Sequence, residues 1–450
     1  MALAMFLCAS LGVLVAVEPR LALAVVLLLA GLLVRARTAL VILLACVVSL
    51  GLVRRVTSGG RTETDPLLLL PIALLALALM WSVGRDRGVA LRRTDPVLGL
   101  ALAALVFLPL ISWALSERSV EALYVAIVYS TCFLAMATAA SGLLPNASEA
   151  VSRAAPWATL AIAGYGLVQF QFLPSWDRAW MVASNLSSIG APVPGQVRVF
   201  GSLESPGPYA LVLGALMCVV AQGVVRGAAR RQLALRVTAL AVAAPAFFLT
   251  GVRTGLLSMA LVLLVAAVKT RSLALVTVAV GASAVLYAVG TRVIASSAET
   301  NVFTVERYTD LGGDQSLEAR LRLLDGVGPA LRQPLGTGFS ASVQRADNLY
   351  IDLLVAAGPL ALLAMLVVAA ITAKRAVAAD WKLPGNDLSL AVLFSMAFTV
   401  AGSTFATTSG LAVALAWGWV LSAPPARPDR DRGRASAQAV RRHPVTGAQP

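Results

Sequence analysis

The chain has 450 residues, of which 59% are hydrophobic and only 13% are charged, and its mean hydropathy is +0.83. Soluble domains have about 45–50% apolar and about 25% charged residues, so this composition excludes an ordinary soluble protein. The only histidine, His443, lies in a polar tail, and the four cysteines all fall inside apolar runs. We therefore expect no imidazole chemistry in the body of the protein, no disulfide framework and no metal site.

Apolar runs recur along the whole chain and are separated by short connections that contain Arg, Pro and Gly. A helix needs roughly 17–25 residues to cross the hydrocarbon core. Because runs 21–34 and 254–268 are short, the prediction is an all-α polytopic membrane protein with about 12–14 transmembrane helices. The candidate spans are 2–17, 21–34, 38–53, 66–83, 96–115, 120–144, 156–173, 208–225, 233–250, 254–268, 272–290, 349–372, 388–402 and 409–422.

The basic residues give the predicted spans an orientation. If the spans alternate from a cytoplasmic N-terminus, most of the 36 Lys and Arg residues fall in connections on one side, which the positive-inside rule assigns to the cytoplasm. The predominance of Arg over Lys, with much Ala and Val, is typical of a GC-rich bacterium. We expect a multi-pass protein of the bacterial cytoplasmic (inner) membrane.

This topology divides the chain into a single polytopic membrane domain, 1–422, and a basic cytoplasmic tail, 423–450, which is rich in Pro, Arg and Gln and is predicted to be disordered. Two long hydrophilic loops, 174–207 and 291–348, then lie outside the cell. Within the second loop the leucines of residues 316–325 share one helical face. We expect an amphipathic helix there, at the outer interface.

Three arginines at the predicted outer ends of spans require an explanation, because the positive-inside bias does not account for them. Arg198 leads into the span at 208, Arg253 separates two apolar runs, and Arg320 lies in the amphipathic segment. They either anchor the protein at lipid phosphates or converge on a phosphorylated ligand, whose oxygens match the planar guanidinium. The glycines at 251 and 255 fit helix packing or, as we favour, a turn close to a ligand.

Asp347 and Asn348 stand directly before the long apolar run at 349. Both residue types are preferred N-caps. A carboxylate at this position is also suited to take a proton from a hydroxyl group. Asp352, one turn into the run, is placed to orient these neighbours.

The order of these motifs resembles the O-antigen ligase and O-antigen polymerase superfamily. The resemblance covers roughly residues 190–370 and rests on R-V-F-G-S at 198–202, T-G-V-R-T-G at 250–255, Arg320, P-L-G-T-G at 334–338, and the run from D-N-L-Y-I-D at 347–352 to Gly358. The signature H-x-H-N of the family reads Arg345-Ala346-Asp347-Asn348 here, and its Pro-Asn after the first arginine reads Pro206-Gly207.

The resemblance implies a metal-independent glycosyltransferase without a cofactor. It would take a glycan from an undecaprenyl pyrophosphate carrier and pass it to a glycan or lipid-glycan acceptor at the outer face of the cytoplasmic membrane. The implied catalytic residues are Arg198, Arg253 and Asp347. The implied substrate-binding residues are Arg320, Arg345, Asn348 and Tyr350.

Fixed arginines where a diphosphate departs would lower the barrier, as a divalent ion does in other sugar transferases. The alternative is a transporter or flippase of an anionic lipid-linked glycan, in which no bond is made. The expected partners are the donor, the acceptor and the lipid bilayer, with no nucleic acid.

Overall fold

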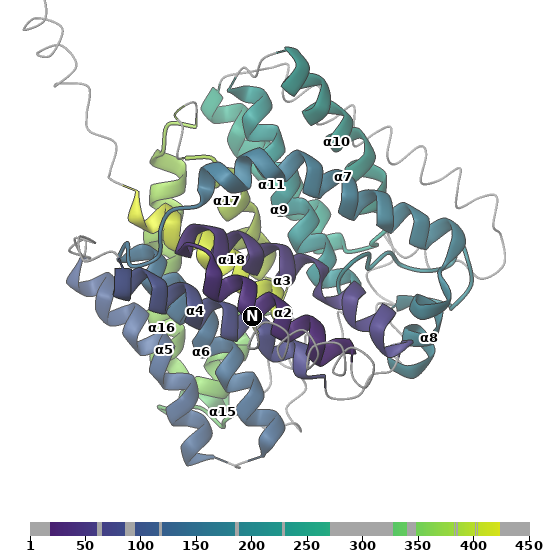
Figure 1. The fold of residues 1–450 in the computed structure, drawn as a ribbon. Helices are drawn as coiled ribbons and strands as arrows, with labels where there is room; N and C mark the ends of the chain where they lie inside the picture. The colour runs from purple at the N-terminus through teal and green to yellow at the C-terminus, as the bar shows by residue number, and fades with distance from the viewer. Residues whose placement is uncertain are drawn as a thin grey trace, which may run out of the picture.

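The computed structural model describes residues 19–60, 65–85, 95–116, 119–184, 189–226, 230–270, 327–339, 348–381, 383, 386–400, 402 and 404–423. Within these ranges the chain is a bundle of helices without β-strands, which confirms the predicted fold class (Figure 1). The helices are α2 (Pro19–Leu33), α3 (Ala36–Ser58), η1 (Pro66–Leu69), α4 (Leu70–Arg85), α5 (Pro96–Leu115), α6 (Val120–Ala140), α7 (Ser148–Phe172), α8 (Ser175–Ser184), α9 (Pro206–Val225), α10 (Arg230–Phe248), α11 (Arg253–Thr270), α15 (Val327–Leu331), α16 (Leu349–Ala378), α17 (Ser389–Thr399), η3 (Thr404–Ala406) and α18 (Ser409–Ser422).

Twelve of the fourteen predicted spans coincide with a helix, and the other two, 2–17 and 272–290, lie outside the described residues. Seven of the described helices are long and apolar enough to cross a membrane. The protein is therefore a multi-pass membrane protein. Helix α7 begins eight residues before its predicted apolar run, because its first turns carry Glu149 and Arg153 at the end of the bundle and only the later turns are apolar.

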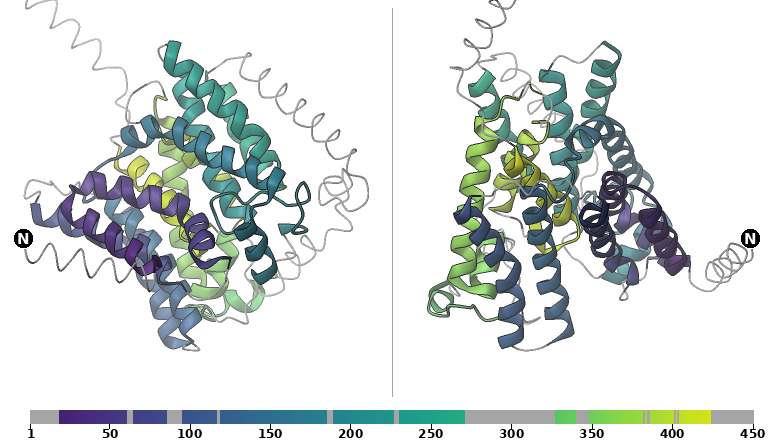
Figure 2. Two further views of the ribbon diagram at one scale, coloured as in Figure 1. Left: turned by 45° about the vertical axis from the view of Figure 1, so that its right-hand side comes forward. Right: turned by 60° about the vertical axis from the view of Figure 1, so that its left-hand side comes forward.

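The helices form two groups joined by a central set (Figures 1 and 2). Helix α7 packs on α9 and α10, while α4 packs on α3, and α5 packs on α6 and α16. Helices α7, α9, α10 and α11 make up the first group, and helices α2 to α6 make up the second. Helix α17 contacts α9 and α11 of the first group as well as α16 and α18, while α16 contacts α5 and α18 contacts α6 of the second group. The two groups therefore meet around α16, α17 and α18.

Hydrogen bonds define which helix ends lie together. The last turn of α3, the last turn of α7 and the end of α10 all contact the segment that precedes α9, through Arg55, Gln169 and the Leu249 carbonyl. Helices α11 and α16 end together, because Lys269 donates to the carbonyls of Val377 and Ala379 near the end of α16. We call the end of the bundle at which α9, α11 and α16 begin the Arg198 end, and the opposite end the Arg226 end.

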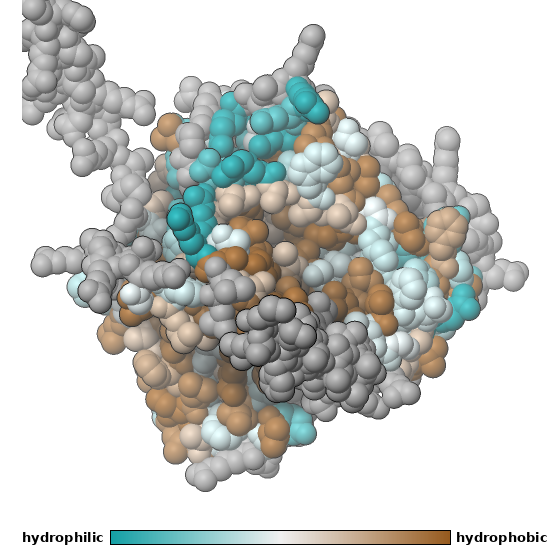
Figure 3. Space-filling model, in the orientation of Figure 1, coloured by the Kyte–Doolittle hydropathy of each residue, from teal (hydrophilic) through white to brown (hydrophobic). Residues whose placement is uncertain are grey.

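The two ends differ in charge. At the Arg226 end the described basic residues clearly outnumber the acidic ones, whereas at the Arg198 end the two signs are nearly balanced. The Arg226 end has Arg35, Arg37, Arg153, Arg226, Arg231, Arg236, Lys269, Lys374 and Arg375 with Asp95, Glu149, Asp380 and Asp387; the Arg198 end has Arg54, Arg55, Arg178, Arg198, Arg253 and Arg332 with Asp65, Glu121, Asp177, Glu204 and Asp352. Figure 3 shows hydrophilic side chains gathered at the upper margin of one face, with isolated ones at its right and lower margins and mainly hydrophobic side chains elsewhere among the coloured residues.

Helix α16 is interrupted, although the apolar run at 349–372 predicts a continuous span. Gly358 has φ 85° and ψ 175°, and Pro359 follows it. Two backbone amides of the P-L-G-T-G segment bond to carbonyls of the broken turn: Thr337 N donates to Val355 O (2.7 Å) and Gly338 N to Ala356 O (3.1 Å). Irregular backbone at membrane depth is tolerated where protein groups satisfy it in this way.

Candidate functional site

The segment that precedes α9 crosses the Arg198 end of the bundle and carries the R-V-F-G-S motif. Arg198 N donates to Ile189 O (2.7 Å), and Val199 N donates to Leu249 O (3.0 Å) at the end of α10. The side chains of Val197, Val199 and Phe200 are fully buried. Backbone hydrogen bonds and these buried side chains thus fix this segment against the body of the bundle.

The structure brings two of the predicted catalytic segments together. The Arg198 guanidinium donates through Nε to Thr250 O (2.9 Å) and through Nη2 to Gly251 O (3.1 Å). Both carbonyls belong to the T-G-V-R-T-G segment, which forms the predicted turn between α10 and α11, with Gly251 at φ 62°. Arg253, the first residue of α11, is half-buried two residues further on. Arg198 is therefore a link between two loops, and its phosphate-binding role stays a prediction.

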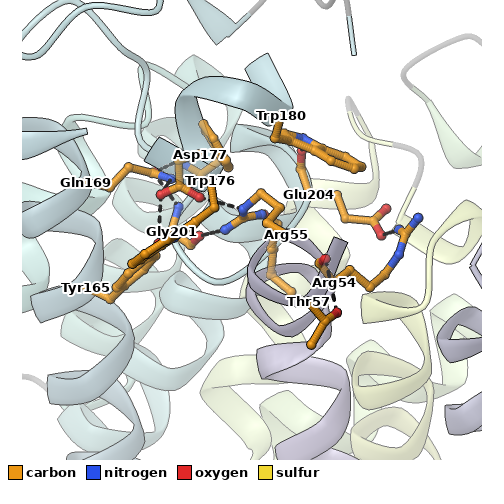
Figure 4. Close-up of polar contacts among 12 residues, drawn as sticks. Arg54, Arg55, Thr57, Tyr165, Gln169, Trp176, Asp177, Trp180, Gly201 and Glu204 are labelled. Atoms are coloured by element: carbon orange, nitrogen blue, oxygen red, sulfur yellow. Dashed lines mark hydrogen bonds and ion pairs between the residues drawn. The ribbon is translucent and has the colours of Figure 1, made fainter. Parts of the chain in front are cut away.

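Beneath this segment lies a polar network that the sequence analysis missed (Figure 4). The Asp177 carboxylate of α8 accepts hydrogen bonds from Arg55 Nε (2.6 Å), the Tyr165 hydroxyl (2.7 Å) and Gln169 Nε2 (2.8 Å). The side chains of Arg55 and Asp177 are both 0% exposed. Isolated buried charges are costly, but here the ion pair is hydrogen-bonded on every side.

The same network holds the backbone of the Arg198 segment. Gln169 Oε1 accepts from Phe200 N (2.9 Å) and Gly201 N (2.8 Å). Arg55 also donates to the carbonyls of Gly201 and Leu203. Arg55 and Gln169 thus position the residues that follow Arg198.

Arg54 makes a second set of contacts beside the first (Figure 4). It forms ion pairs with Asp65 (3.4 Å) and with Glu204, and its guanidinium lies 5.5 Å from the ring centre of Trp180. The neighbouring arginines of α3 thereby fasten the whole stretch 201–204. In the sequence, these contacts are indicated only by two adjacent arginines at the end of an apolar run. The partners cannot be identified there, because they are 11 to 150 residues away.

The beginning of α16 is the second part of the candidate site. Asn348 is the N-cap: its side-chain oxygen accepts from Tyr350 N (2.9 Å) and Ile351 N (3.2 Å), while its Nδ2 donates to Val400 O (2.6 Å). The capping interpretation is confirmed for this residue. Tyr350 is half-buried against the hydrophobic core. The Tyr129 hydroxyl donates to Asp352 (3.3 Å) one turn into the helix.

Three predicted site residues, Arg320, Arg345 and Asp347, lie outside the described residues, as do the amphipathic segment 316–325 and the tail beyond residue 423. Their roles remain predictions. The described members Arg198, Arg253, Asn348 and Tyr350 all lie at the Arg198 end.

The P-L-G-T-G motif at 334–338 also packs directly against the interrupted turn of α16 at Gly358. A Cβ atom at Gly358 would lie 2.3 Å from Pro334 O, and one at Gly336 would lie 2.6 Å from Val355 O. Ser112 of α5 donates to Ala356 O from the other side. Only glycine permits this close approach, which explains why both segments contain it.

Metal ligands do not cluster in the described part of the chain: no three His, Cys, Asp or Glu side chains are placed to hold a metal ion there. The arrangement offers instead arginine guanidinium groups, a capped helix N-terminus and one carboxylate beside a tyrosine. Guanidinium groups and helix N-termini both favour anions. Comparison of the chain with protein-family models, curated proteins and solved structures finds no match.

Proposed function

We propose that the protein is a membrane glycosyltransferase that polymerises or ligates oligosaccharide carried on undecaprenyl pyrophosphate, for cell-surface polysaccharide assembly. The observation that carries the proposal is the pairing of the Arg198 side chain with the turn that precedes Arg253. Both segments belong to the sequence pattern that resembles the O-antigen ligase and O-antigen polymerase superfamily. Their direct contact supports a shared anion-binding end of the bundle.

In this proposal the arginines stabilise the diphosphate leaving group as the glycosidic bond to the carrier breaks. An acceptor hydroxyl attacks the anomeric carbon, and Asp347 takes its proton. Arg320, Arg345, Asn348 and Tyr350 bind the substrates. The reaction takes place at the outer leaflet of a bacterial cytoplasmic membrane, with the basic Arg226 end and the C-terminal tail in the cytoplasm.

The test is a transfer assay with purified protein in liposomes, an undecaprenyl pyrophosphate-linked oligosaccharide and an acceptor glycan. Arg198→Ala and Arg253→Ala should each reduce product formation by about 100-fold or more, as loss of one transition-state donor does. Arg178→Ala is the matched control, because Arg178 is an exposed arginine at the same end of the bundle. Wild-type turnover in either site variant would refute the proposal.

A second candidate function is a transporter or flippase, and the interrupted helix α16 favours it. Transporters use discontinuous helices at their substrate sites. The same liposomes distinguish the two functions. Leaflet movement of the lipid-linked glycan without product would support the transporter.

A further inference from the structure

An apolar cavity lies between the two helix groups, in the half of the bundle nearer the Arg226 end. Helices α3, α7, α9, α17 and α18 line it, and its volume is about 210 Å³. One water molecule needs roughly 10–15 Å³ of such space. The cavity is therefore large enough for a ligand of many atoms.

The lining excludes a polar ligand in the body of the cavity. It consists almost wholly of Ala, Val and Leu side chains. The hydroxyl of Ser395, which also lines it, already donates to Val392 O and accepts from the Trp417 indole, both at 2.8 Å. The ligand must itself be hydrocarbon where it contacts these walls.

The cavity lies between helices but opens to the surface of the bundle. Val41 and Ala45 of α3 and Ala154 of α7 line it and are nevertheless exposed. Val41 and Ala45 belong to α3, which is long and apolar enough to cross a membrane, so the medium beside them is lipid rather than water. Ala154 lies in the second turn of α7, nearer the Arg226 end.

Two arginines near the Arg226 end of the cavity, Arg37 and Arg153, are suited to bind the phosphate of a lipid headgroup. Arg37 continues the stripe of α3 that includes Val41, Ala45 and Val48, at helical spacing. Arg37 and Arg153 share a single acidic partner, Glu149, at 3.6 and 3.9 Å, and their side chains are 47% and 71% exposed. The mouth therefore has an excess of positive charge, which attracts anionic lipid.

The indole of Trp419 supplies an independent observation. It lines the cavity, is 3% exposed, and its Nε1–H has no hydrogen-bond partner among the described residues. A buried donor without an acceptor is unfavourable. Trp419 is also near the end of α18, and tryptophans are enriched where the ends of membrane helices meet the polar part of a bilayer.

We propose that this cavity binds one acyl chain of an anionic phospholipid, with the phosphate at Arg37 and Arg153 and a glycerol ester carbonyl accepting from Trp419 Nε1. The site would hold a membrane lipid between the two helix groups. It is separate from the candidate site at the Arg198 end, and it does not depend on the proposed function.

The test is native mass spectrometry of the full chain purified in mild detergent with phosphatidylglycerol. The wild type should retain one phosphatidylglycerol molecule. The double variant Ala45→Phe/Ala154→Phe, which fills the cavity, should retain about tenfold less, because each excluded methylene loses apolar burial. Ala103→Phe is the control, since Ala103 is exposed on α5 outside the cavity. Equal retention by all three proteins, or none by the wild type, would overturn the proposal.

Two further measurements apply even if the filled variant fails to fold. A phospholipid with a photoreactive acyl chain should label the wild type within 41–48 or 150–158, and labelling elsewhere alone would contradict the site. Trp419→Phe should lower phosphatidylglycerol retention relative to the control variant. Arg37→Gln should lower retention of phosphatidylglycerol more than that of phosphatidylcholine. A polyprenyl phosphate retained in place of phosphatidylglycerol would also contradict the proposal.

Discussion

At the scale of single residues, the buried ion pair between Arg55 and Asp177 is the main polar feature of the bundle. Its guanidinium and carboxylate are both 0% exposed. Such pairs add little net stability compared with apolar residues, but removal of one partner leaves the other charge unpaired. The pair therefore joins α3 to α8 at the Arg198 end.

Arg55→Ala should destabilise the protein by about 3–5 kcal/mol, because Asp177 would remain as a buried carboxylate without its cation. The measurement is the thermal unfolding midpoint in detergent. Arg178→Ala, which removes an exposed arginine of α8, should leave that midpoint nearly unchanged. An Arg55→Ala protein as stable as the control would show that the network is not formed.

Arg198 illustrates how a residue selected for one role can have another. The sequence offered lipid anchoring or phosphate binding, whereas its side chain bonds to two backbone carbonyls of a neighbouring loop. Arg198 therefore positions the Arg253 turn, and anion binding by Arg198 stays a prediction.

At the scale of elements, the interruption of α16 joins two motifs that the sequence presents as separate. Gly358 adopts a backbone conformation that only glycine reaches readily, and the P-L-G-T-G segment fills the break. The break lies beyond Asn348 and Asp352 on the same helix. The unit therefore fixes the first part of α16, which carries these candidate site residues.

Gly358→Ala should destabilise the protein by more than about 1 kcal/mol through backbone strain alone, with a further loss from the clash with Pro334 O. Gly164→Ala is the matched control. Gly164 lies inside α7 with open space at its Cβ position, so alanine there should stabilise by roughly 0.5–1 kcal/mol. Thermal unfolding of the two variants in opposite directions would confirm the break, and equal behaviour would argue for a continuous helix.

At the scale of the whole molecule, much of the fold could be predicted from the sequence because apolar runs report directly on helices in a bilayer. The described helices follow these runs, and the basic connections gather at one end of the bundle as predicted. The interruption of α16 could not be predicted, since Gly-Pro in an apolar run is compatible with a kinked but continuous span. The Arg55–Asp177 pair joins residues 122 positions apart, and nothing local in sequence identifies such a partner.

The candidate site was predicted in part. The order of the motifs in the sequence indicated the segments of Arg198 and Arg253 and also Asn348. The structure brings the first two segments into contact, and Asn348 lies at the same end of the bundle. Arg54, Arg55 and Asp177, which hold the Arg198 segment in place, were missed because their role depends on tertiary contacts alone.

The proposed orientation, with the Arg198 end outside the cell, is tested most directly by cysteine labelling. Val193→Cys, an exposed position in the Arg198 segment, and Arg231→Cys, an exposed position at the Arg226 end, would be treated in intact cells with a membrane-impermeant maleimide. Both variants would be made in a Cys8→Ala chain, which also serves as the background, because the other three cysteines, Cys46, Cys132 and Cys218, are buried. We predict labelling of the cysteine at 193 in intact cells and of the cysteine at 231 only after permeabilisation. The reverse pattern would place Arg198 and Arg253 in the cytoplasm and contradict both this orientation and the proposed function.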